Sequence, residues 1–353
     1  MSDLSLPMSF ESGAPSDRSS SLGWTTGSGD RPIPVFHSIE EVPAEFGPSV
    51  AAIGNFDGVH LGHREILTSV VAEARALGVR AVAVTFDPHP EQFLRPARAP
   101  KWLTPMEERT RLMAATGLDA VLVLRFDAAL ARLTAEEFVS RILVGTLGIR
   151  GLHEGGNFHF GHGAQAGVAE LERFGADLGF AVHVHSPVKV RGIEVSSSAI
   201  RERVAAGDLT RARWMLGRSF SVLGRQTSGR GIGRRLLVPT VNLDAPEGIL
   251  PPFGVYVTRL KVGGPQSSRQ FEAVTNLGNR PTFGAPSFAI ESHILNLEPG
   301  DLDELGELEE RTPIEVEFLL RLRPEIEWPT PEALKAQIFK DMARAKRYFR
   351  LAR

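Results

Sequence analysis

The sequence predicts an α/β domain with a doubly wound parallel sheet, followed by a smaller antiparallel β domain and a C-terminal helix. The chain has 353 residues, which is too long for most single hydrophobic cores. Apolar strand-like runs alternate with helical patterns over residues 33–217, as in parallel sheets with helices on both faces. After residue 217, short strand-like runs follow one another with Gly- and Pro-rich turns between them. That pattern is typical of an antiparallel barrel or sandwich.

The composition indicates an ordinary globular protein, with 42% hydrophobic and 23% charged residues. A net charge of -2 gives no electrostatic reason to expect nucleic acid or a membrane surface as a partner. The chain has no cysteine, which excludes disulfides, thiolate chemistry and Cys-ligated zinc. No apolar run approaches the roughly 20 residues that span a bilayer. We therefore expect a cytoplasmic protein that is a monomer or a weak homo-oligomer.

Residues 1–32 differ from the rest of the chain. About half of them are Ser, Gly, Thr or Pro, and few could join a core. Their few basic residues fit neither a secretory signal nor a transit peptide. We expect a disordered tail.

In the first domain, strands alternate with helices. Strands are expected at residues 49–54, 80–86, 119–126 and 180–185, and helices at 63–78, 104–117 and 134–148. Gly78 should end the first helix. Thr104 should cap the second helix, with Pro105 at its first position. Thr134 and Glu137 have the spacing of a capping box at the start of the third.

The second domain should consist of strands and one helix. Strands are expected at residues 220–226, 253–262, 271–278, 288–297 and 314–323. One helix at residues 330–349 closes the chain. The residues that share one face of this helix and should pack on the strands are Leu334, Ile338, Met342, Ala345 and Phe349.

The segment AAIGNFDGVHLGHREIL (51–67) carries the strongest functional signal. An apolar strand ends at Gly54, a turn follows, and His60 and His63 lie where a helix begins. Ligands of doubly wound sheets bind beyond the carboxyl ends of the strands, and a helix start offers free N–H groups and a partial positive charge. Two histidines three residues apart can face the same ligand. The pattern favours a nucleoside triphosphate whose α-phosphate is attacked, with catalysis by positioning and charge stabilisation.

Two other interpretations of this turn stay open. His60 and His63 could be half of a metal site, although no carboxylate or cysteine stands at ligand spacing. The segment could also be a tight turn with incidental histidines.

The string GNFDGVHLGH resembles the His-x-Gly-His motif of the nucleotidylyltransferases. In its particular form it is similar to the family of bifunctional bacterial riboflavin kinase/FAD synthetases, and the resemblance runs from residue 50 to about residue 350. Further segments that resemble this family are VTFDPHPEQFLRP (84–96), GGNFHFGHGAQAG (155–167) and VSSSAIRE (195–202). The resemblance implies a nucleotidylyltransferase (FAD synthetase) domain over residues 33–217 and a riboflavin kinase Greek-key β-barrel over residues 218–353.

The resemblance also implies roles for single residues of the first domain. Those that would cradle and activate ATP are Gly54, Asn55, Phe56, Asp57, Gly58, His60 and His63. Those that would close on its phosphates are Ser197, Ser198 and Arg201, with Ser198 in place of the family's threonine. His89 would belong to the flavin/ATP cleft and Asn157 would reach the nucleotide. A plain turn around His89 and a local turn contact of Asn157 stay open. The histidines expected on the surface or in packing are His153, His159, His162, His183 and His185.

In the second domain, LLVPTVNL (236–243) resembles the Pro-Thr-x-Asn motif of riboflavin kinases. Thr240 and Asn242 alternate with Val241, so on a strand they point to one face. A hydroxyl and an amide there can hold Mg²⁺ and phosphate oxygens. The resemblance implies Thr240 and Asn242 as metal ligands, and Glu291 as the base that takes the proton from the ribityl 5′-hydroxyl. The other residues implied to bind the nucleotide are Gly229, Gly231, Gly233 and Pro239.

The chain departs from the family pattern in the loops of the kinase half. Leu237 and Val238 stand where a glycine and an aromatic residue are usual, and residues 301–310 replace a shorter acidic segment. In the first domain, His159 stands where an arginine is frequent. The adenylylation half is therefore better supported than the kinase half.

The function expected from the sequence is a bifunctional flavin-nucleotide enzyme that uses Mg²⁺. It would phosphorylate riboflavin to FMN with ATP, and transfer AMP from ATP to FMN to give FAD and pyrophosphate. One alternative is an FMN adenylyltransferase whose barrel binds flavin but phosphorylates it slowly. A second alternative is a flavin-binding regulatory protein without turnover.

Overall fold

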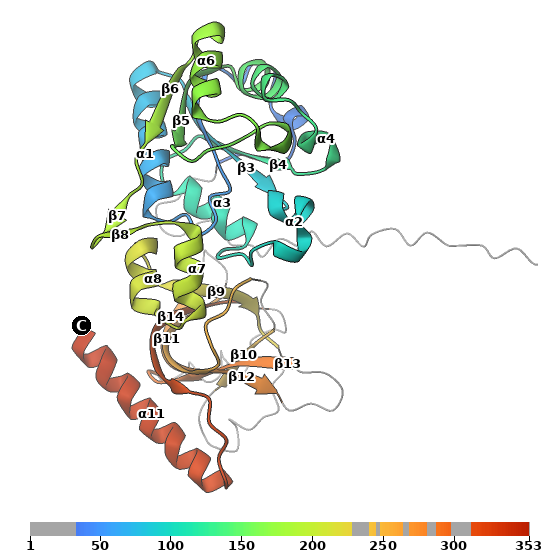
Figure 1. Cartoon of the computed structure of the whole chain (residues 1–353). Coiled ribbons are helices and arrows are strands. Elements are labelled where there is room, and N and C mark those ends of the chain that lie inside the picture. Colours follow the sequence, from blue (N-terminus) through green and yellow to red (C-terminus); the bar gives the residue numbers. More distant parts are fainter. Residues whose placement is uncertain are drawn as a thin grey trace, which may run out of the picture.

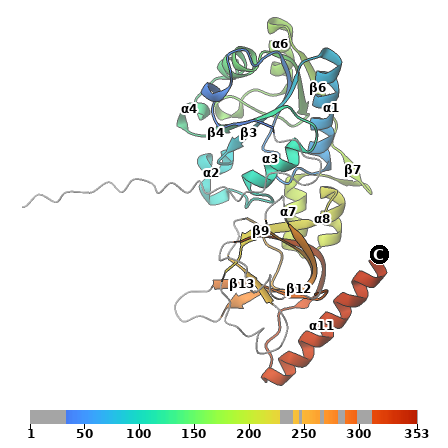
Figure 2. The same ribbon diagram turned by 180° about the vertical axis from the view of Figure 1, so that it is seen from behind.

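The computed structural model describes residues 33–227, 240–244, 248–263, 268–280, 287–297 and 312–352. Figures 1 and 2 show an α/β part above an antiparallel β part, with a long C-terminal helix beside the latter. Several predictions lie outside the described residues. These are the tail of residues 1–32, the segment 301–310, and Gly229, Gly231, Gly233, Leu237, Val238 and Pro239.

The N-terminal part is built on a six-stranded sheet with the order β1-β4-β3-β2-β5-β6, and all its pairings are parallel. Its strands are β1 (Val35–Phe36), β2 (Ser49–Ile53), β3 (Arg80–Asp87), β4 (Ala120–Arg125), β5 (Ile149–Gly155) and β6 (Ala181–His185). The chain builds outward from β2 through β3 and β4, then returns to the other side of β2 with β5 and β6. This confirms the doubly wound sheet and puts its switch point between β2 and β5.

Helices cover both faces of this sheet. They are α1 (Leu61–Leu77), α2 (Pro90–Leu94), α3 (Met106–Ala114), α4 (Ala128–Ala131), α5 (Ala135–Glu137), the π-helix η3 (Phe138–Thr146) and α6 (Val168–Leu178). Short 3₁₀ turns lie at η1 (Ile39–Glu41), η2 (Pro96–Arg98) and η4 (His162–Ala164). Gly78 ends α1 with φ 66°, because a left-handed residue costs glycine little. Thr134 and Glu137 form the predicted capping box.

The predicted cap of the second helix is wrong by one residue. Pro105 occupies the N-cap position, and α3 begins at Met106. The hydroxyl of Thr104 instead accepts a hydrogen bond from Gly58 N at 3.0 Å. A distant turn therefore uses the side chain that the local pattern assigned to the helix.

The second part is a six-stranded antiparallel sheet with the order β10-β13-β12-β11-β14-β9. Its strands are β9 (Phe220–Arg225), β10 (Thr240–Leu243), β11 (Gly254–Val262), β12 (Arg269–Arg280), β13 (Ser287–Ile294) and β14 (Pro313–Pro324). A bridge between Gln226 and Leu243 joins the two outer strands, so the sheet curls toward a closed barrel. This confirms the predicted antiparallel barrel.

The C-terminal helix α11 (Pro331–Ala352) packs on the outer face of the barrel. Ala345 and Phe349 are buried against Val255 and Val257, with Met342 beside them. The prediction that Leu334 packs on the strands is wrong, because this residue is 36% exposed. Only the C-terminal half of the predicted stripe reaches the sheet.

Two helices between the parts, α7 (Ser197–Ala205) and α8 (Leu209–Leu216), follow a small hairpin, β7 (Lys189–Val190) and β8 (Ile193–Glu194). Their apolar side chains, such as Ile200 and Met215, share one continuous core with Phe220 and Phe318 of the barrel. The boundary at residue 217 stays a prediction. The barrel nevertheless buries one of its surfaces against α7 and α8, which precede residue 217 in the chain.

We expect a fragment of residues 187–353 to be more stable than one of residues 218–353. The shorter fragment leaves uncovered the barrel surface that α7 and α8 bury, and each large apolar side chain contributes about 1.5–3 kcal/mol. Thermal unfolding followed by circular dichroism should show a melting temperature lower by about 10 °C or more for the shorter fragment. Equal melting temperatures would contradict a shared core.

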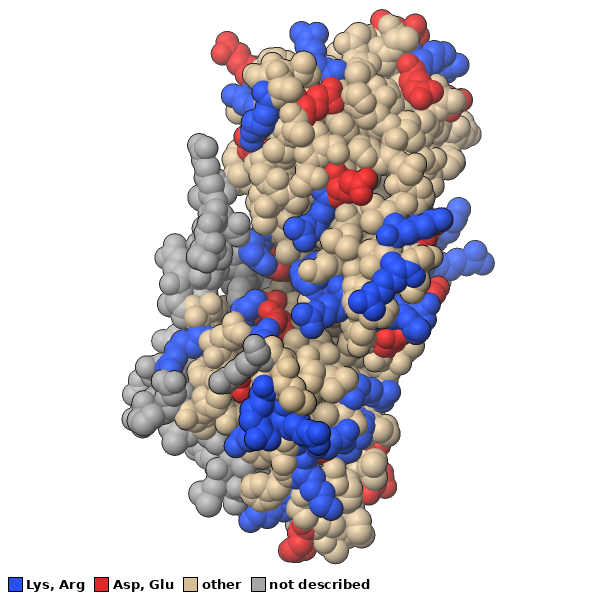
Figure 3. Space-filling view, turned by 90° about the vertical axis from the view of Figure 1, so that its left-hand side faces the viewer, with Lys and Arg blue, Asp and Glu red and all other residues tan. Residues whose placement is uncertain are grey.

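One face of the molecule is markedly basic. Figure 3 shows Lys and Arg side chains gathered over its middle and lower parts, with fewer acidic ones among them. Helix α11 carries the exposed basic residues Lys335, Lys340, Arg344, Lys346, Arg347 and Arg350. In the described part of the chain, no helix combines the length and apolar character needed to cross a bilayer.

Candidate active sites

The turn from β2 into α1 has an unusual backbone. Phe56, Gly58 and Val59 all have positive φ, at 45°, 85° and 36°. For the two residues with side chains this conformation is costly and persists only where the surroundings hold it. Phe56 and Val59 are 2% and 1% exposed, so packing provides that support. The turn is a tightly specified structure at the carboxyl end of β2.

Asp57 is the centre of a buried network under this turn. Its carboxylate accepts hydrogen bonds from Leu103 N at 3.0–3.1 Å and from Thr104 N at 3.1 Å. Arg201 Nη2 donates to Asp57 Oδ2 at 2.5 Å, and Arg109 Nη2 lies 3.6 Å from Oδ1. The side chain is 1% exposed. The oxygens of Asp57 thus contact three protein segments, and its expected role in cradling ATP stays a prediction.

Arg109 is a site residue that the sequence analysis missed. It is fully buried, and its two Nη atoms donate to Asn55 O and Thr104 O, each at 3.1 Å. Its guanidinium lies 4.1 Å from the centre of the Trp102 ring. Burial lowers the pKa of Arg109 to about 10, although Asp57 opposes this shift. The sequence did contain a signal for Arg109. It stands three residues after Met106, which puts an arginine on the apolar face of a helix.

His60 and His63 are brought together as the spacing predicted. His60 caps α1, and its Nδ1 accepts from His63 N at 3.2 Å, so the ring proton of neutral His60 lies on Nε2. The two rings stack with centres 3.6 Å apart. Burial lowers the pKa of His60 to about 4 and that of His63 well below 6.5. Both imidazoles are therefore neutral hydrogen-bonding groups at pH 7.

Folding stability should fall as the pH drops from about 6.5 toward 4, because unfolded His60 takes up a proton that folded His60 refuses. At pH 5 this single group should cost about 2 kcal/mol relative to pH 7.5. Urea unfolding at both pH values measures the loss. His60→Asn, which keeps a capping acceptor, should lose about 2 kcal/mol less than the parent, and exposed His37→Asn should match the parent. Equal losses in parent and His60→Asn would show that His60 does not titrate this way.

Helix α7 reaches the same network from the other part of the chain. Ser197 Oγ donates to Asp57 O at 2.9 Å, and Arg201 Nε donates to Lys101 O at 2.8 Å. Ser198 follows Ser197 in α7 and is exposed. His89 caps α2 and its ring lies 5.2 Å from that of Trp102, at the edge of the network. The 54–63 turn, His89 and the start of α7 thus converge.

Asn157 is not among the residues that meet here. It is exposed, in the loop after β5, and its backbone oxygen bonds to His159 Nδ1 at 2.9 Å.

The backbone pairing of β2 with β5 ends at Ala52 and His153. Beyond that point, Ile53 N donates to the side chain of Glu154 at 2.7 Å. Burial raises the pKa of Glu154 well above its usual value, and its carboxyl group closes the switch point between the two strands.

The barrel brings its predicted residues to one face. In the register of β10 with β13, Asn242 stands opposite Glu291 and Thr240 opposite His293, and residues directly opposite share a face. Thr240 Oγ1 and His293 Nδ1 are 3.0 Å apart. Asn276 of β12 also stands opposite Glu291. His293 and Asn276 are thus neighbours that the sequence analysis missed, because only pairing places them there.

The Thr240–Asn242 pair fits a hard cation. The Oδ1 atom of Asn242 is buried and has no hydrogen-bond partner among the described residues. Burying such an acceptor without a partner is costly. An amide oxygen beside a hydroxyl and the Glu291 carboxylate is the kind of oxygen-rich donor set that Mg²⁺ takes.

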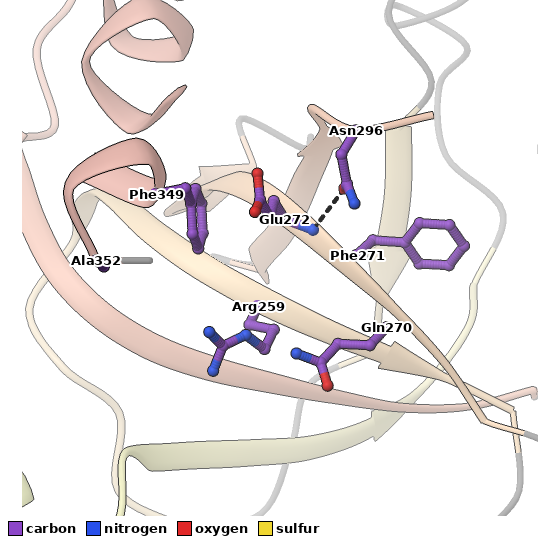
Figure 4. A pocket seen from close by; sticks show the side chains of 7 residues that line it. All are labelled: Arg259, Gln270, Phe271, Glu272, Asn296, Phe349 and Ala352. Carbon is purple, nitrogen blue, oxygen red and sulfur yellow. Dashed lines mark hydrogen bonds between the residues drawn. The ribbon is translucent and has the colours of Figure 1, made fainter. Parts of the chain in front are cut away.

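A separate cavity of about 240 Å³ lies where α11 meets the barrel. Figure 4 shows Phe349 on one side of it and Arg259 and Gln270 on the other, with Glu272 N donating to Asn296 Oδ1 at 2.7 Å. The remaining lining residues are Phe271 and Ala352. None of the residues predicted for either site lines it.

Comparison with known proteins connects these two assemblies to known families. A family model described as FAD synthetase matches residues 42–199, and one described as riboflavin kinase matches residues 216–349. The bifunctional riboflavin kinase/FMN adenylyltransferase of Pseudomonas fluorescens is 37% identical over 84% of this chain and 92% of that protein. The protein of the same description from Escherichia coli K12 is 32% identical over 90% of this chain and 97% of that protein.

A solved structure has the same fold over most of the chain. It is described as a macrolide-efflux protein from Streptococcus pneumoniae, with a TM-score of 0.76, 23% identity, and coverage of 88% of this chain and 98% of that chain. This likeness concerns the fold alone, whereas the two curated relatives share sequence across both parts. The chain therefore belongs to the family of bifunctional riboflavin kinase/FMN adenylyltransferases.

Proposed function

We propose that the chain makes FAD from riboflavin in two ATP-dependent steps. The barrel transfers the γ-phosphoryl group of ATP to riboflavin, which gives FMN and ADP. The α/β part transfers AMP from a second ATP to FMN, which gives FAD and pyrophosphate. The observation that carries this proposal is that each part assembles its own set of motif residues, one around His60 and His63 and one around Thr240, Asn242 and Glu291.

In the adenylyl transfer, an oxygen of the FMN phosphate attacks the α-phosphorus of ATP and the bond to pyrophosphate breaks. Negative charge on the phosphates is met by the N-terminus of α1 and by N–H donors of neutral His60 and His63. Arg201 adds a positively charged guanidinium, which its contact with Asp57 holds in place. Because each neutral imidazole carries one ring N–H, each histidine can donate one hydrogen bond to a phosphate oxygen.

In the phosphoryl transfer, the ribityl 5′-hydroxyl attacks the γ-phosphorus and ADP leaves. Glu291 takes the hydroxyl proton as general base. Its position opposite Asn242 in the sheet supports this role. Since positioning and charge neutralisation supply most of the rate in such transfers, the base contributes the smaller share.

Mg²⁺ is the proposed metal of the kinase step, held by Thr240 and Asn242. The buried Asn242 Oδ1 without a partner among the described residues supports this assignment. The bound ion would neutralise charge on the ATP phosphates. Thr240 keeps its contact with His293 on the same face, which orients the hydroxyl.

One assay tests the proposal. The protein is incubated with riboflavin, ATP and Mg²⁺, and in parallel with FMN, ATP and Mg²⁺, and the three flavins are separated by chromatography. FAD in both reactions is the expected result. If FAD forms only in the reaction that starts from FMN, an adenylyltransferase with an inactive barrel is favoured. Flavin binding without any product would favour a regulatory protein.

A cytoplasmic location, a monomeric or weakly homo-oligomeric state, and the lack of nucleic-acid and membrane partners stay predictions.

A further inference from the structure

Three histidines and a glutamate meet on the α1 side of the sheet, away from both sites. His153 Nε2 lies 2.6 Å from Glu73 Oε2, and His183 Nε2 lies 3.1 Å from the same oxygen. His153 and His183 stand opposite each other in the pairing of β5 with β6. Helix α1, which carries Glu73, runs beside these strands in Figures 1 and 2. Three separate elements thus deliver one ligand atom each.

The spacing of these atoms suits a small divalent cation. The ligand atoms of Glu73, His153 and His183 all lie within 4.8 Å of one another. Tetrahedral zinc with bonds of about 2.0–2.1 Å places its ligand atoms about 3.3 Å apart. The distance from Glu73 to His183 already matches this value, and that from Glu73 to His153 needs to open by less than about 1 Å.

The surroundings orient the ligands as metal sites do. Histidines that bind metals usually engage a second partner through their other ring nitrogen, and His153 Nδ1 lies 3.0 Å from His185 Nε2. Gly151 leaves room for the carboxylate, because a Cβ at that position would lie 2.6 Å from Glu73 Oε1. A residue with a side chain there would push Glu73 out of the cluster.

The cluster is also prepared electrostatically and open to solvent on one side. Burial lowers the pKa of His153 and His185 below 6.5, although Glu73 raises the first and Glu65 the second. Neutral imidazoles are the form that binds zinc. His183 is 46% exposed, which provides an entry path for an ion.

We propose that Glu73, His153 and His183 form a Zn²⁺ site with a fourth position open to water, and that His185 orients His153. Glu73 lies 13 residues beyond His60 along α1, which is about 20 Å at 1.5 Å per residue. A bound ion would fasten α1, which has His60 and His63 at its N-terminal end, to β5 and β6.

Zinc binding to the full-length protein tests the proposal without an activity readout. Chelator-treated protein, free of ATP and Mg²⁺, is titrated with Zn²⁺ by calorimetry, and its thermal unfolding is followed with and without zinc. The variants are His183→Ala, at the most exposed ligand, and Glu73→Gln, which keeps the shape and removes the charge. His37→Ala, an exposed histidine outside the cluster, is the matched control.

Parent and His37→Ala should each bind one more Zn²⁺ per chain than His183→Ala and Glu73→Gln. Zinc at about 100 times the dissociation constant should raise the melting temperature of parent and control by about 5 °C or more. The two cluster variants should lack this rise. No zinc bound by the parent would overturn the proposal. Equal uptake by parent and His183→Ala would also overturn it, since the ion would then bind elsewhere, for example at His60 and His63.

Discussion

Replacing His63 with alanine should lower the rate of FAD formation from FMN by about 10²-fold or more, the range seen when one pre-placed donor to a transition state is removed. His63 stacks on the ring of His60 and makes a T-shaped contact with the ring of Phe56. Its neutral state at pH 7 follows from burial. The donor therefore needs no reorganisation when charge develops on the α-phosphate.

The same variant should form FMN from riboflavin at the parental rate, because the kinase residues lie on the barrel. Chromatography of flavins with riboflavin or FMN as the starting substrate separates the two activities. His37→Ala serves as the histidine control, and a melting curve of each variant shows that the fold is retained. If His63→Ala makes FAD as fast as the parent does, the role proposed for the 54–63 turn is wrong.

Replacing Glu291 with glutamine should reduce FMN formation by about 10²-fold, the lower end of the range for a general base. Glutamine keeps the shape of the side chain on β13 and removes its ability to accept the proton. Asn242 and Asn276, which flank Glu291 across the sheet, remain in place. Conversion of FMN to FAD should stay intact in this variant.

A matched control for this variant is Glu272→Gln, which changes a half-buried glutamate of strand β12 outside the proposed site. The measurement is the initial rate of riboflavin phosphorylation by the full-length protein at saturating ATP and Mg²⁺. If Glu291→Gln phosphorylates riboflavin at the parental rate, Glu291 is not the general base. The barrel would then act through positioning and the metal alone.

The alternation of strands and helices, the capping box at Thr134 and the turn that brings His60 and His63 to a helix start were predictable from the sequence. These features depend on residues within a few positions of one another, and local backbone chemistry dictates them. The two functional parts were predictable for the same reason, since each motif is contiguous. Thr104 shows the limit, because its hydroxyl binds Gly58 N instead of capping the adjacent helix.

Only the tertiary structure decided which residues far apart in the sequence come into contact. Arg201 reaches Asp57 across 144 positions of the chain, and this contact ties α7 to the turn after β2. Strand register placed His293 opposite Thr240, and sheet packing gathered His153, His183 and Glu73 into one cluster. A helical or strand pattern specifies which face of an element is apolar or polar, but not which partner that face meets. Burial then keeps His60 and His63 neutral, because desolvation depends on everything packed around a group.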